Sequence, residues 1–223
     1  MKFYGPGSGD LRLSFDGLIT ENFEGEIGFN IIDELNATDF YEAPASTKYH
    51  NSCPYGLIAH TLNVVEAGKI ICDSFSHSDY KKSVIRTALL HDICKADFYK
   101  EGVKNVKTYL PYGASPIRGV KLQQDTGGTF YWKPTPFYTI DESFLYGHGE
   151  KSVYLALQYG ADLTPAEAQA IRYHMGDFNK NPETTAVYTK NPVALILHMA
   201  DLYASSYLDF NSEQSAAFFE SLR

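Results

Sequence analysis

The chain has 223 residues, 44% of them hydrophobic, and a formal net charge of −8 at neutral pH. This length suits one large domain or two small ones with a sizeable core. The acidic balance argues against the clustered basic face with which proteins bind nucleic acid. No apolar segment approaches the roughly 18 residues of a transmembrane helix, and the N-terminal residues lack the apolar stretch of a signal peptide.

The three cysteines, Cys53, Cys72 and Cys94, are odd in number and irregularly spaced. Secreted domains that depend on disulfides usually carry paired cysteines in a regular framework. We therefore expect reduced thiols and a cytoplasmic protein. The sequence has no CxxC motif, which argues against a zinc site built from thiolates.

Residues 1–25 are rich in glycine and polar residues, and we expect an N-terminal extension there, followed by a single domain over residues 26–223. The first strong helical pattern is "LIAHTLNVVEAGKIICDSF", residues 57–75, in which apolar residues recur at the spacing of a helical face. A second helix is predicted in "KKSVIRTALLHDICK", residues 81–95, where Val84, Ala88 and His91 fall on one stripe.

The helical pattern breaks over residues 101–147. Residues 128–140, "GTFYWKPTPFYTI", are aromatic and β-branched and include Pro134 and Pro136. Because proline cannot donate a hydrogen bond within a sheet, we expect a small β-hairpin here, with an edge strand at most. Trp132, Phe137 and Tyr138 could form a shelf for a nucleobase, but a small core of the insertion itself is the favoured interpretation.

Two further helices carry clear start signals. In "LTPAEAQAIRYHMG", residues 163–176, Thr164 is a candidate N-cap, Pro165 takes the first helical position, Glu167 completes a capping box and Gly176 ends the pattern. The segment "NPVALILHMADLYASSYL", residues 191–208, also opens with an Asn N-cap and a proline. The sequence therefore predicts an all-α fold of about six to nine helices with one small β insertion.

Six residues in these elements are of types that bind metal ions: His60, His91, Asp92, His148, His174 and Asp201. Asp201 lies in an apolar helix, where an unpaired carboxylate would be costly and a cation would remove that cost. Imidazole and carboxylate ligands together suit divalent transition metals such as Mn, Fe, Co, Ni or Zn. Any one of these residues alone is more often structural than a ligand, so the interpretation depends on their combination.

Three segments, "GLIAHTLNVV", "ALLHDICKADFY" and "ILHMADLYAS", resemble the first-ligand, His-Asp and last-Asp motifs of the HD-domain superfamily of metal-dependent phosphohydrolases. The resemblance runs from about Phe40 to about Asp209. The "GHG" turn and His174 resemble ligands of the HD-GYP cyclic-dinucleotide phosphodiesterases. The GYP motif is absent, however, which argues against assigning that substrate.

The resemblance implies a binuclear metal centre. His60, His91, Asp92 and Asp201 would hold one ion, and Asp92 would bridge to a second ion held by His148 and His174. A water shared by both ions would become the nucleophile, so Asp92 would be part of the catalytic machinery. Lys95, the matched lysine of the motif, would contact a nonbridging phosphoryl oxygen as a catalytic and substrate-binding residue.

Four other polar residues have less certain roles. Lys151, which follows the "GHG" turn, could contact a substrate phosphate, although an ordinary solvated lysine is equally plausible. His198 lies three residues before Asp201 and is interpreted as structural rather than as a ligand. His50 lies in a loop and could bind substrate, but a structural role is favoured. His77 is expected at the surface.

The predicted function is metal-dependent hydrolysis of a phosphomonoester or phosphodiester, in a nucleotide or short oligonucleotide, with about two divalent ions per chain. The expected partner is this small phosphorylated substrate, with no membrane and no extended nucleic-acid surface; the oligomeric state is left open. Two alternatives remain. HD-fold oxygenases such as myo-inositol oxygenase use a similar ligand pattern to hold two irons, and a noncatalytic nucleotide-binding HD module is the least favoured possibility.

Overall fold

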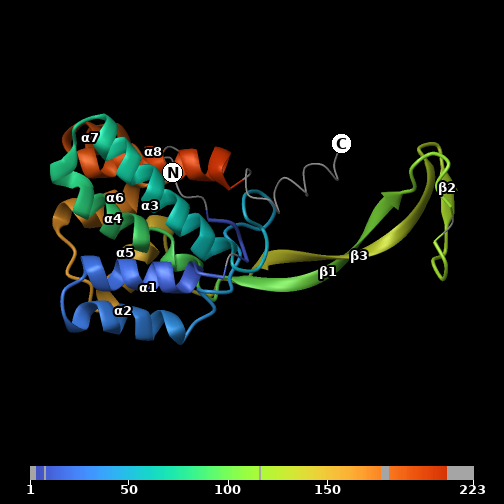
Figure 1. The fold of residues 1–223 in the computed structure, drawn as a ribbon, viewed down its shortest axis with the longest axis horizontal. Coiled ribbons are helices and arrows are strands. Elements are labelled where there is room, and N and C mark those ends of the chain that lie inside the picture. Colours follow the sequence, from blue (N-terminus) through green and yellow to red (C-terminus); the bar gives the residue numbers. More distant parts are fainter. Residues whose placement is uncertain (1–3, 8, 116, 177–180, 210–223) are drawn as a thin grey trace.

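A helical body and a long projecting β-ribbon make up the structure (Figure 1). The computed structural model describes residues 4–7, 9–115, 117–176 and 181–209. Within these residues lie eight α-helices, Leu11–Asn22 (α1), Glu26–Asn36 (α2), Gly56–Ser74 (α3), Lys81–Leu90 (α4), His148–Gln158 (α5), Pro165–Tyr173 (α6), Thr184–Lys190 (α7) and Pro192–Tyr203 (α8). The strands are Tyr99–Tyr109 (β1), Gln123–Asp125 (β2) and Gly128–Ile140 (β3). Short helical turns cover Ser78–Tyr80 (η1), Ile93–Lys95 (η2) and Ala204–Leu208 (η4). The prediction of a mostly helical fold with a small β insertion is confirmed.

Helix α3 lies at the centre of the body, and α1, α4 and α8 all pack against it. Gly68 allows α4 to approach closely, because a Cβ atom there would lie 2.6 Å from the Val84 side chain. Most of α3 is buried, polar residues such as His60 and Asn63 included. These polar side chains must therefore find their partners inside the protein.

The predicted start signals of α6 and α8 are confirmed. The Thr164 side chain accepts a hydrogen bond from the Glu167 N–H, and the Glu167 carboxylate accepts one from the Thr164 N–H. The Asn191 side chain accepts from the Ala194 N–H at the start of α8. A proline occupies the beginning of both helices. Gly176, predicted to end the pattern, adopts a left-handed φ of 60° shortly after α6.

Helix α1 lies in the segment that we expected to be an extension. Phe15 and Ile19 are fully buried, and the Phe15 ring lies 5.0 Å from that of Phe40 between centroids. This segment therefore contributes to the hydrophobic core of the body. At the other end, residues 210–223 of the predicted domain lie outside the described residues. None of the helices in the described ranges combines the length and the apolar character needed to cross a bilayer.

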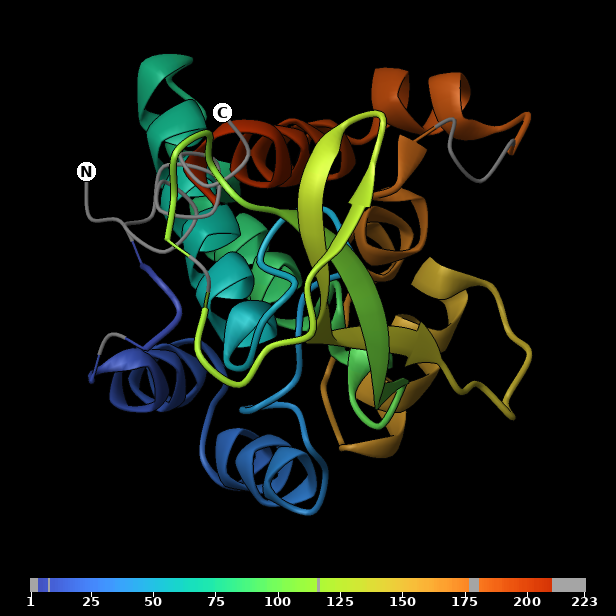
Figure 2. The same ribbon diagram turned by 90° about the vertical axis from the view of Figure 1, so that its right-hand side faces the viewer.

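The ribbon consists of β1 and β3, paired antiparallel from Tyr99 opposite Ile140 to Tyr109 opposite Phe130. Figure 2 looks along this ribbon onto the body. The short β2 pairs with β3 only at its far end, so β3 is the middle strand there. Along the stretch that holds Pro134 and Pro136, β1 is its only partner among the described strands. The two prolines can thus face the open side, as the edge-strand prediction requires.

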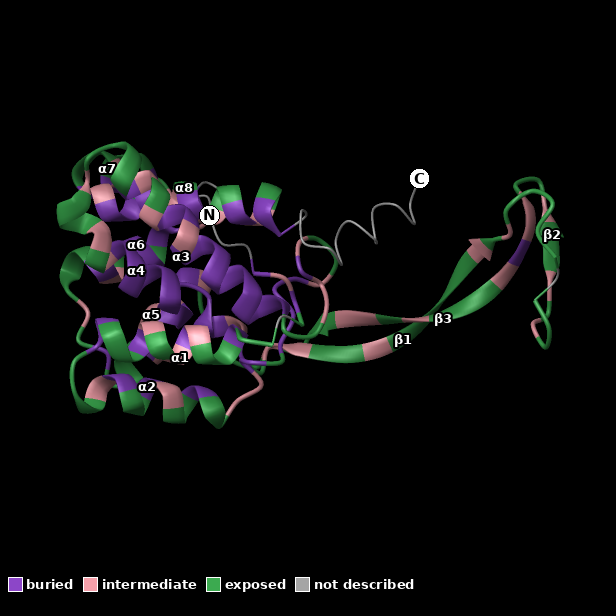
Figure 3. Ribbon diagram, in the orientation of Figure 1, coloured by how far each residue is buried: buried purple, intermediate pink, exposed green. Residues whose placement is uncertain are grey.

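The ribbon is largely exposed, whereas most of the buried residues lie in the helical body (Figure 3). Phe130 is an exception at 5% exposure. Its ring contacts those of Tyr109 and Trp132 edge-on, and the Lys107 ammonium lies 4.2 Å from its centroid. Trp132 thus contributes to a small core at the tip of the insertion. Nearer the body, the Phe137 ring covers Gly102, and Tyr138 contacts Tyr99.

Candidate metal centre

The six predicted ligands come from distant parts of the chain and meet at the centre of the body. Two of them, His91 and His174, are the residues immediately after α4 and α6. His60 lies in α3, Asp201 in α8, and Asp92 between α4 and η2. His148 begins α5. The side chains of His60, His91, Asp92 and His174 are at most 3% exposed, while Asp201 and His148 are 15% and 21% exposed.

The "GHG" turn has a packing explanation. A Cβ atom on Gly149 would lie 2.2 Å from the carbonyl oxygen of Arg172, so a residue larger than glycine cannot fit there. The missing side chain allows the start of α5 to rest on the last turn of α6. This contact brings the rings of His148 and His174 to 5.3 Å between centroids.

Asp92 lies between two pairs of histidines. Its Oδ2 atom is 3.6 Å from His60 Nε2 and 3.4 Å from His91 Nε2. Its Oδ1 atom is 2.7 Å from His148 Nε2 and 3.6 Å from His174 Nε2. Each carboxylate oxygen therefore faces one pair of imidazoles, and the ligand atoms of each group are close enough to hold one ion.

Asp201 completes the cluster from α8. Its Oδ1 atom lies 3.3 Å from His60 Nε2. Ligand atoms of Asp201, His91 and His174 also lie within 4.8 Å of one another. Asp201 thus reaches histidines from both pairs.

The outward-facing nitrogens of His91 and His174 are held by hydrogen bonds to backbone carbonyls. His91 Nδ1 donates to the carbonyl of Ala88 at 2.8 Å, and His174 Nδ1 donates to that of Ile171 at 2.6 Å. These carbonyls belong to the last turns of α4 and α6, where no helical N–H remains to pair with them. The Nδ1–H bonds leave each Nε2 with its lone pair, the arrangement typical of metal-binding histidines.

His174 Nε2 is buried and has no hydrogen-bond partner. A buried polar atom without a partner is rare in proteins, and it calls for an explanation. A metal ion coordinated by this nitrogen would supply one. The set of imidazoles and carboxylates around it matches the ligands that divalent transition metals prefer. The residues present therefore fit the implied metal ions.

The electrostatics of the cluster favour positive charge. Burial raises the pKa of Asp92, but the charges of Lys95 and His91 outweigh it and hold that pKa well below its usual value. Burial likewise opposes ionisation of Asp201, while His60 lowers its pKa. Burial also disfavours protonation of His60, but Asp209 and Asp201 raise its pKa to about 10. Two carboxylates thus stay ionised in a buried space, and a divalent cation would satisfy them.

The two predicted substrate-binding lysines are already paired with carboxylates. Lys95 Nζ donates to Asp92 Oδ2 at 2.6 Å, at the edge of the cluster. Lys151 is buried, donates to Glu142, and lies over the Phe98 ring. Lys95 therefore adjoins the candidate ligands directly, whereas Lys151 is engaged by a residue outside the predicted set.

The remaining histidines differ in their distance from the cluster. His198 Nδ1 donates to the His174 carbonyl at 2.6 Å, and its ring stacks on Tyr188, which is the structural role that we expected. His77 lies at the far end of α3 against Tyr80. The His50 ring lies 4.8 Å from that of His60, and burial lowers the pKa of His50 to about 3.

Asp209 is the main residue that sequence reasoning missed. It is fully buried; its Oδ2 accepts from His60 Nδ1 at 2.8 Å and its Oδ1 from Asn63 Nδ2 at 2.9 Å. It therefore fixes the orientation of His60. The only available signal was an acidic residue in the apolar "YLDF" segment, where an unpaired carboxylate would be costly.

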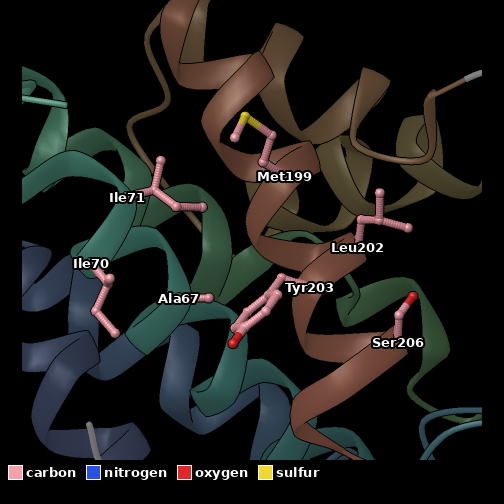
Figure 4. A pocket seen from close by; sticks show the side chains of 7 residues that line it. All are labelled: Ala67, Ile70, Ile71, Met199, Leu202, Tyr203 and Ser206. Carbon is pink, nitrogen blue, oxygen red and sulfur yellow. The ribbon is translucent and has the colours of Figure 1, made fainter. Parts of the chain in front are cut away.

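A separate groove lies between α3 and α8 (Figure 4). It has a volume of about 690 Å³ and is lined by Ala67, Ile70, Ile71, Met199, Leu202, Tyr203 and Ser206. None of these residues is a candidate metal ligand, and their side chains are almost all apolar. The groove therefore offers no group for the chemistry of the cluster.

In a comparison with protein families, residues 57–205 match the model described as the HD domain. Searches of curated proteins and of solved structures each gave no significant match. The matched residues include His60, His91, Asp92, His148, His174 and Asp201. The match identifies the HD domain without singling out the HD-GYP branch. Since it covers about two thirds of the chain, the protein belongs to the HD-domain family.

Proposed function

We propose that the protein is a metal-dependent phosphohydrolase that cleaves a phosphomonoester or phosphodiester of a nucleotide or short oligonucleotide. The observation that carries this proposal is the position of Asp92, with one oxygen toward His60 and His91 and the other toward His148 and His174. A carboxylate in this position suits a bridge between two metal ions. Asp201 would complete the first ion's ligands.

When bound, the two ions would lower the pKa of a shared water and polarise the phosphoryl group. The protein's own role is to hold the metal-binding side chains in the orientation that coordination requires. Ala88, Ile171 and Asp209 fix the ring orientations through the Nδ1 atoms. Lys95 is held beside Asp92 and protonated, so it can neutralise charge that develops on a nonbridging phosphoryl oxygen. Lys151, paired with Glu142, would be a more peripheral contact for the substrate.

The test is a substrate panel with the manganese-loaded protein under anaerobic conditions. We expect hydrolysis of at least one substrate among p-nitrophenyl phosphate, bis(p-nitrophenyl) phosphate, nucleoside monophosphates, cyclic nucleotides and short single strands. Asp92→Asn should abolish this activity, while Asp125→Asn on the exposed ribbon serves as the matched control. Absence of hydrolysis across the panel would contradict the proposal. Consumption of oxygen with ferrous iron would then favour an oxygenase.

A further inference from the structure

Four buried side-chain polar atoms have no hydrogen-bond partner in the described part of the chain. One is His174 Nε2, which faces the candidate metal centre. The other three are His50 Nε2 and both polar atoms of the Asn51 carboxamide, Nδ2 and Oδ1. Leaving such atoms unpaired in a protein interior is costly, and native proteins rarely do so without a functional reason. Three of the four belong to two consecutive residues of one loop.

This loop is fixed against the beginning of α3. The Asn51 carbonyl accepts hydrogen bonds from the N–H groups of Ala45 and Cys53, at 3.1 and 2.9 Å. A Cβ atom on Gly56 would lie only 2.0 Å from the same carbonyl oxygen. His60 follows Gly56 by one helical turn. The Asn51 backbone is therefore held within about a turn of the first candidate ligand.

His50 lies close to His60 and Asp209 and is not grouped with Asp92 or Asp201, the carboxylates of the predicted ligand set. Ligand-type atoms of His50, His60 and Asp209 lie within 4.8 Å of one another. Asp209 binds Nδ1 of His60, whereas Asp92 and Asp201 face its Nε2. His50 itself is only partly buried, whereas Asn51 is 4% exposed. A group bound at this loop would thus lie beside the metal cluster rather than within it.

The chemistry of the loop selects an uncharged ligand group. A carboxamide offers one donor and one acceptor side by side, and the imidazole offers a further nitrogen. Neither is the cation that phosphate binding favours. Asparagine pairs in this two-point manner with the edge of a nucleobase, as it does with adenine.

We propose that the His50–Asn51 loop binds the nucleobase of the substrate, next to the metal centre that would hold the phosphoryl group. This inference rests on the proposed function, and it adds which part of the protein would recognise the base of the proposed nucleotide substrate. The loop would act through hydrogen bonds to the base, leaving the chemistry to the metal centre.

The experiment compares the four ribonucleoside 5′-monophosphates with ribose 5-phosphate, which has the same phosphoryl group and no base. We expect the metal-loaded protein to favour at least one nucleotide by about 10-fold in kcat/KM, the effect of one or two hydrogen bonds. Asn51→Gly should remove this preference while leaving metal content and the ribose 5-phosphate rate unchanged. Glycine retains the left-handed φ of 43° at this position.

Two controls match the variants. Ser76→Gly likewise introduces glycine at a residue with positive φ, 56°, in the exposed segment that follows α3. His50→Gln should raise KM for the favoured nucleotide, and His77→Gln is its surface counterpart. Melting temperatures of all four variants establish that they fold.

Two outcomes would overturn the inference. Equal losses on the nucleotide and on ribose 5-phosphate in Asn51→Gly would assign the loop to support of the metal centre. No change on either substrate would mean that only water satisfies the unpaired atoms. If the wild type hydrolyses nothing, the proposed function fails, and equilibrium dialysis with adenosine, guanosine, cytidine and uridine decides the inference alone. Binding that Asn51→Gly abolishes would support it, and no binding would refute it.

Discussion

Two Asp–Lys ion pairs have the same length and opposite surroundings. In the helical body Lys95 Nζ lies 2.6 Å from Asp92 Oδ2, and on the ribbon Lys107 Nζ lies 2.6 Å from Asp125 Oδ2. The Asp92 side chain is 3% exposed, whereas that of Asp125 is 29% exposed. Water and salt screen the electrostatic interaction of the exposed pair, whereas the buried pair is screened much less. Burial, rather than the distance between the two charged atoms, distinguishes the Lys95–Asp92 pair from the exposed pair on the ribbon.

The body and the ribbon differ in the same way. The body surrounds its histidines and carboxylates with apolar side chains, which hold these groups in one arrangement. The ribbon exposes most of its residues to solvent. It begins four residues after Lys95 and ends eight residues before His148. The ribbon is thus an insertion between two parts of the ligand set, and we expect changes within it to leave the metal centre intact.

The largest effect should come from the buried carboxylate. Asp92→Asn removes the charge that faces both histidine pairs, so we expect loss of both metal ions and of all measurable hydrolysis. Asp125→Asn removes the corresponding carboxylate of the ribbon and should change neither. Elemental analysis and the rate on the best substrate measure the two variants side by side. Similar metal content and similar hydrolysis rates in the two variants would contradict the expected difference between the body and the ribbon.

The next effect concerns the lysines of the same two pairs. Lys95→Ala should lower kcat on the order of 10²-fold with metal content intact, the usual cost of one donor to transition-state charge. Without metal, the variant leaves buried Asp92 without its lysine partner, which should destabilise the protein by roughly 3 kcal/mol until metal is added. Lys107→Ala should change neither kcat nor metal binding. Loss of metal from Lys95→Ala would instead make this lysine a support for the ligands.

A moderate effect should appear with pH. His60 has a pKa raised from 6.5 to about 10, because Asp209 and Asp201 outweigh its burial. In metal-free protein the protonated ring therefore adds stability that is complete below pH 6.5 and lost as pH rises toward 10. Metal binding needs the deprotonated ring, so metal affinity should rise over the same range.

Calorimetry can follow both trends. The melting temperature of EDTA-treated protein should fall between pH 6.5 and 10, and the increase on adding manganese should grow. His60→Gln should flatten the first trend. A metal-free melting temperature that rises across this range would contradict the assigned role of His60.

The smallest effect should come from shortening the ribbon. Because Val103 pairs with Pro136, a two-residue turn such as Asn-Gly can join these positions and replace residues 104–135. We expect unchanged metal content and a helical circular dichroism spectrum, since the lost residues contribute little to the core of the body. Loss of metal from the shortened protein would show that the ribbon supports the centre after all.

The sequence was most informative where a local rule decides the structure. Proline and a capping side chain start α6 and α8 as predicted, and the spacing of apolar residues located α3 and α4. Strand β1 had no comparable signal, because its residues are largely polar and it is defined by pairing with β3. Helix α1 was also missed, although Leu11, Phe15 and Ile19 recur at helical spacing, because the segment was judged on its glycine and polar content.

The candidate site was predictable in its ligand types but not in its supports. The six histidines and aspartates occur in a recognisable order, and the structure brings all of them together. Backbone carbonyls such as those of Ala88 and Ile171 have no sequence signature, because every residue has one. Lys95 and its partner Asp92 are only three residues apart, whereas the pairing of Lys151 with Glu142 has no local pattern that would have predicted it.

The number of metal ions per chain tests the central claim most directly. We expect protein grown with added manganese or iron to carry about two ions per chain, one for each histidine pair that faces Asp92. His148→Ala should carry about one, because only the second pair loses a ligand. Elemental analysis of both proteins, purified without chelators, gives the answer. Wild-type protein without transition metal after growth in either medium would contradict the assignment of this cluster as a metal centre.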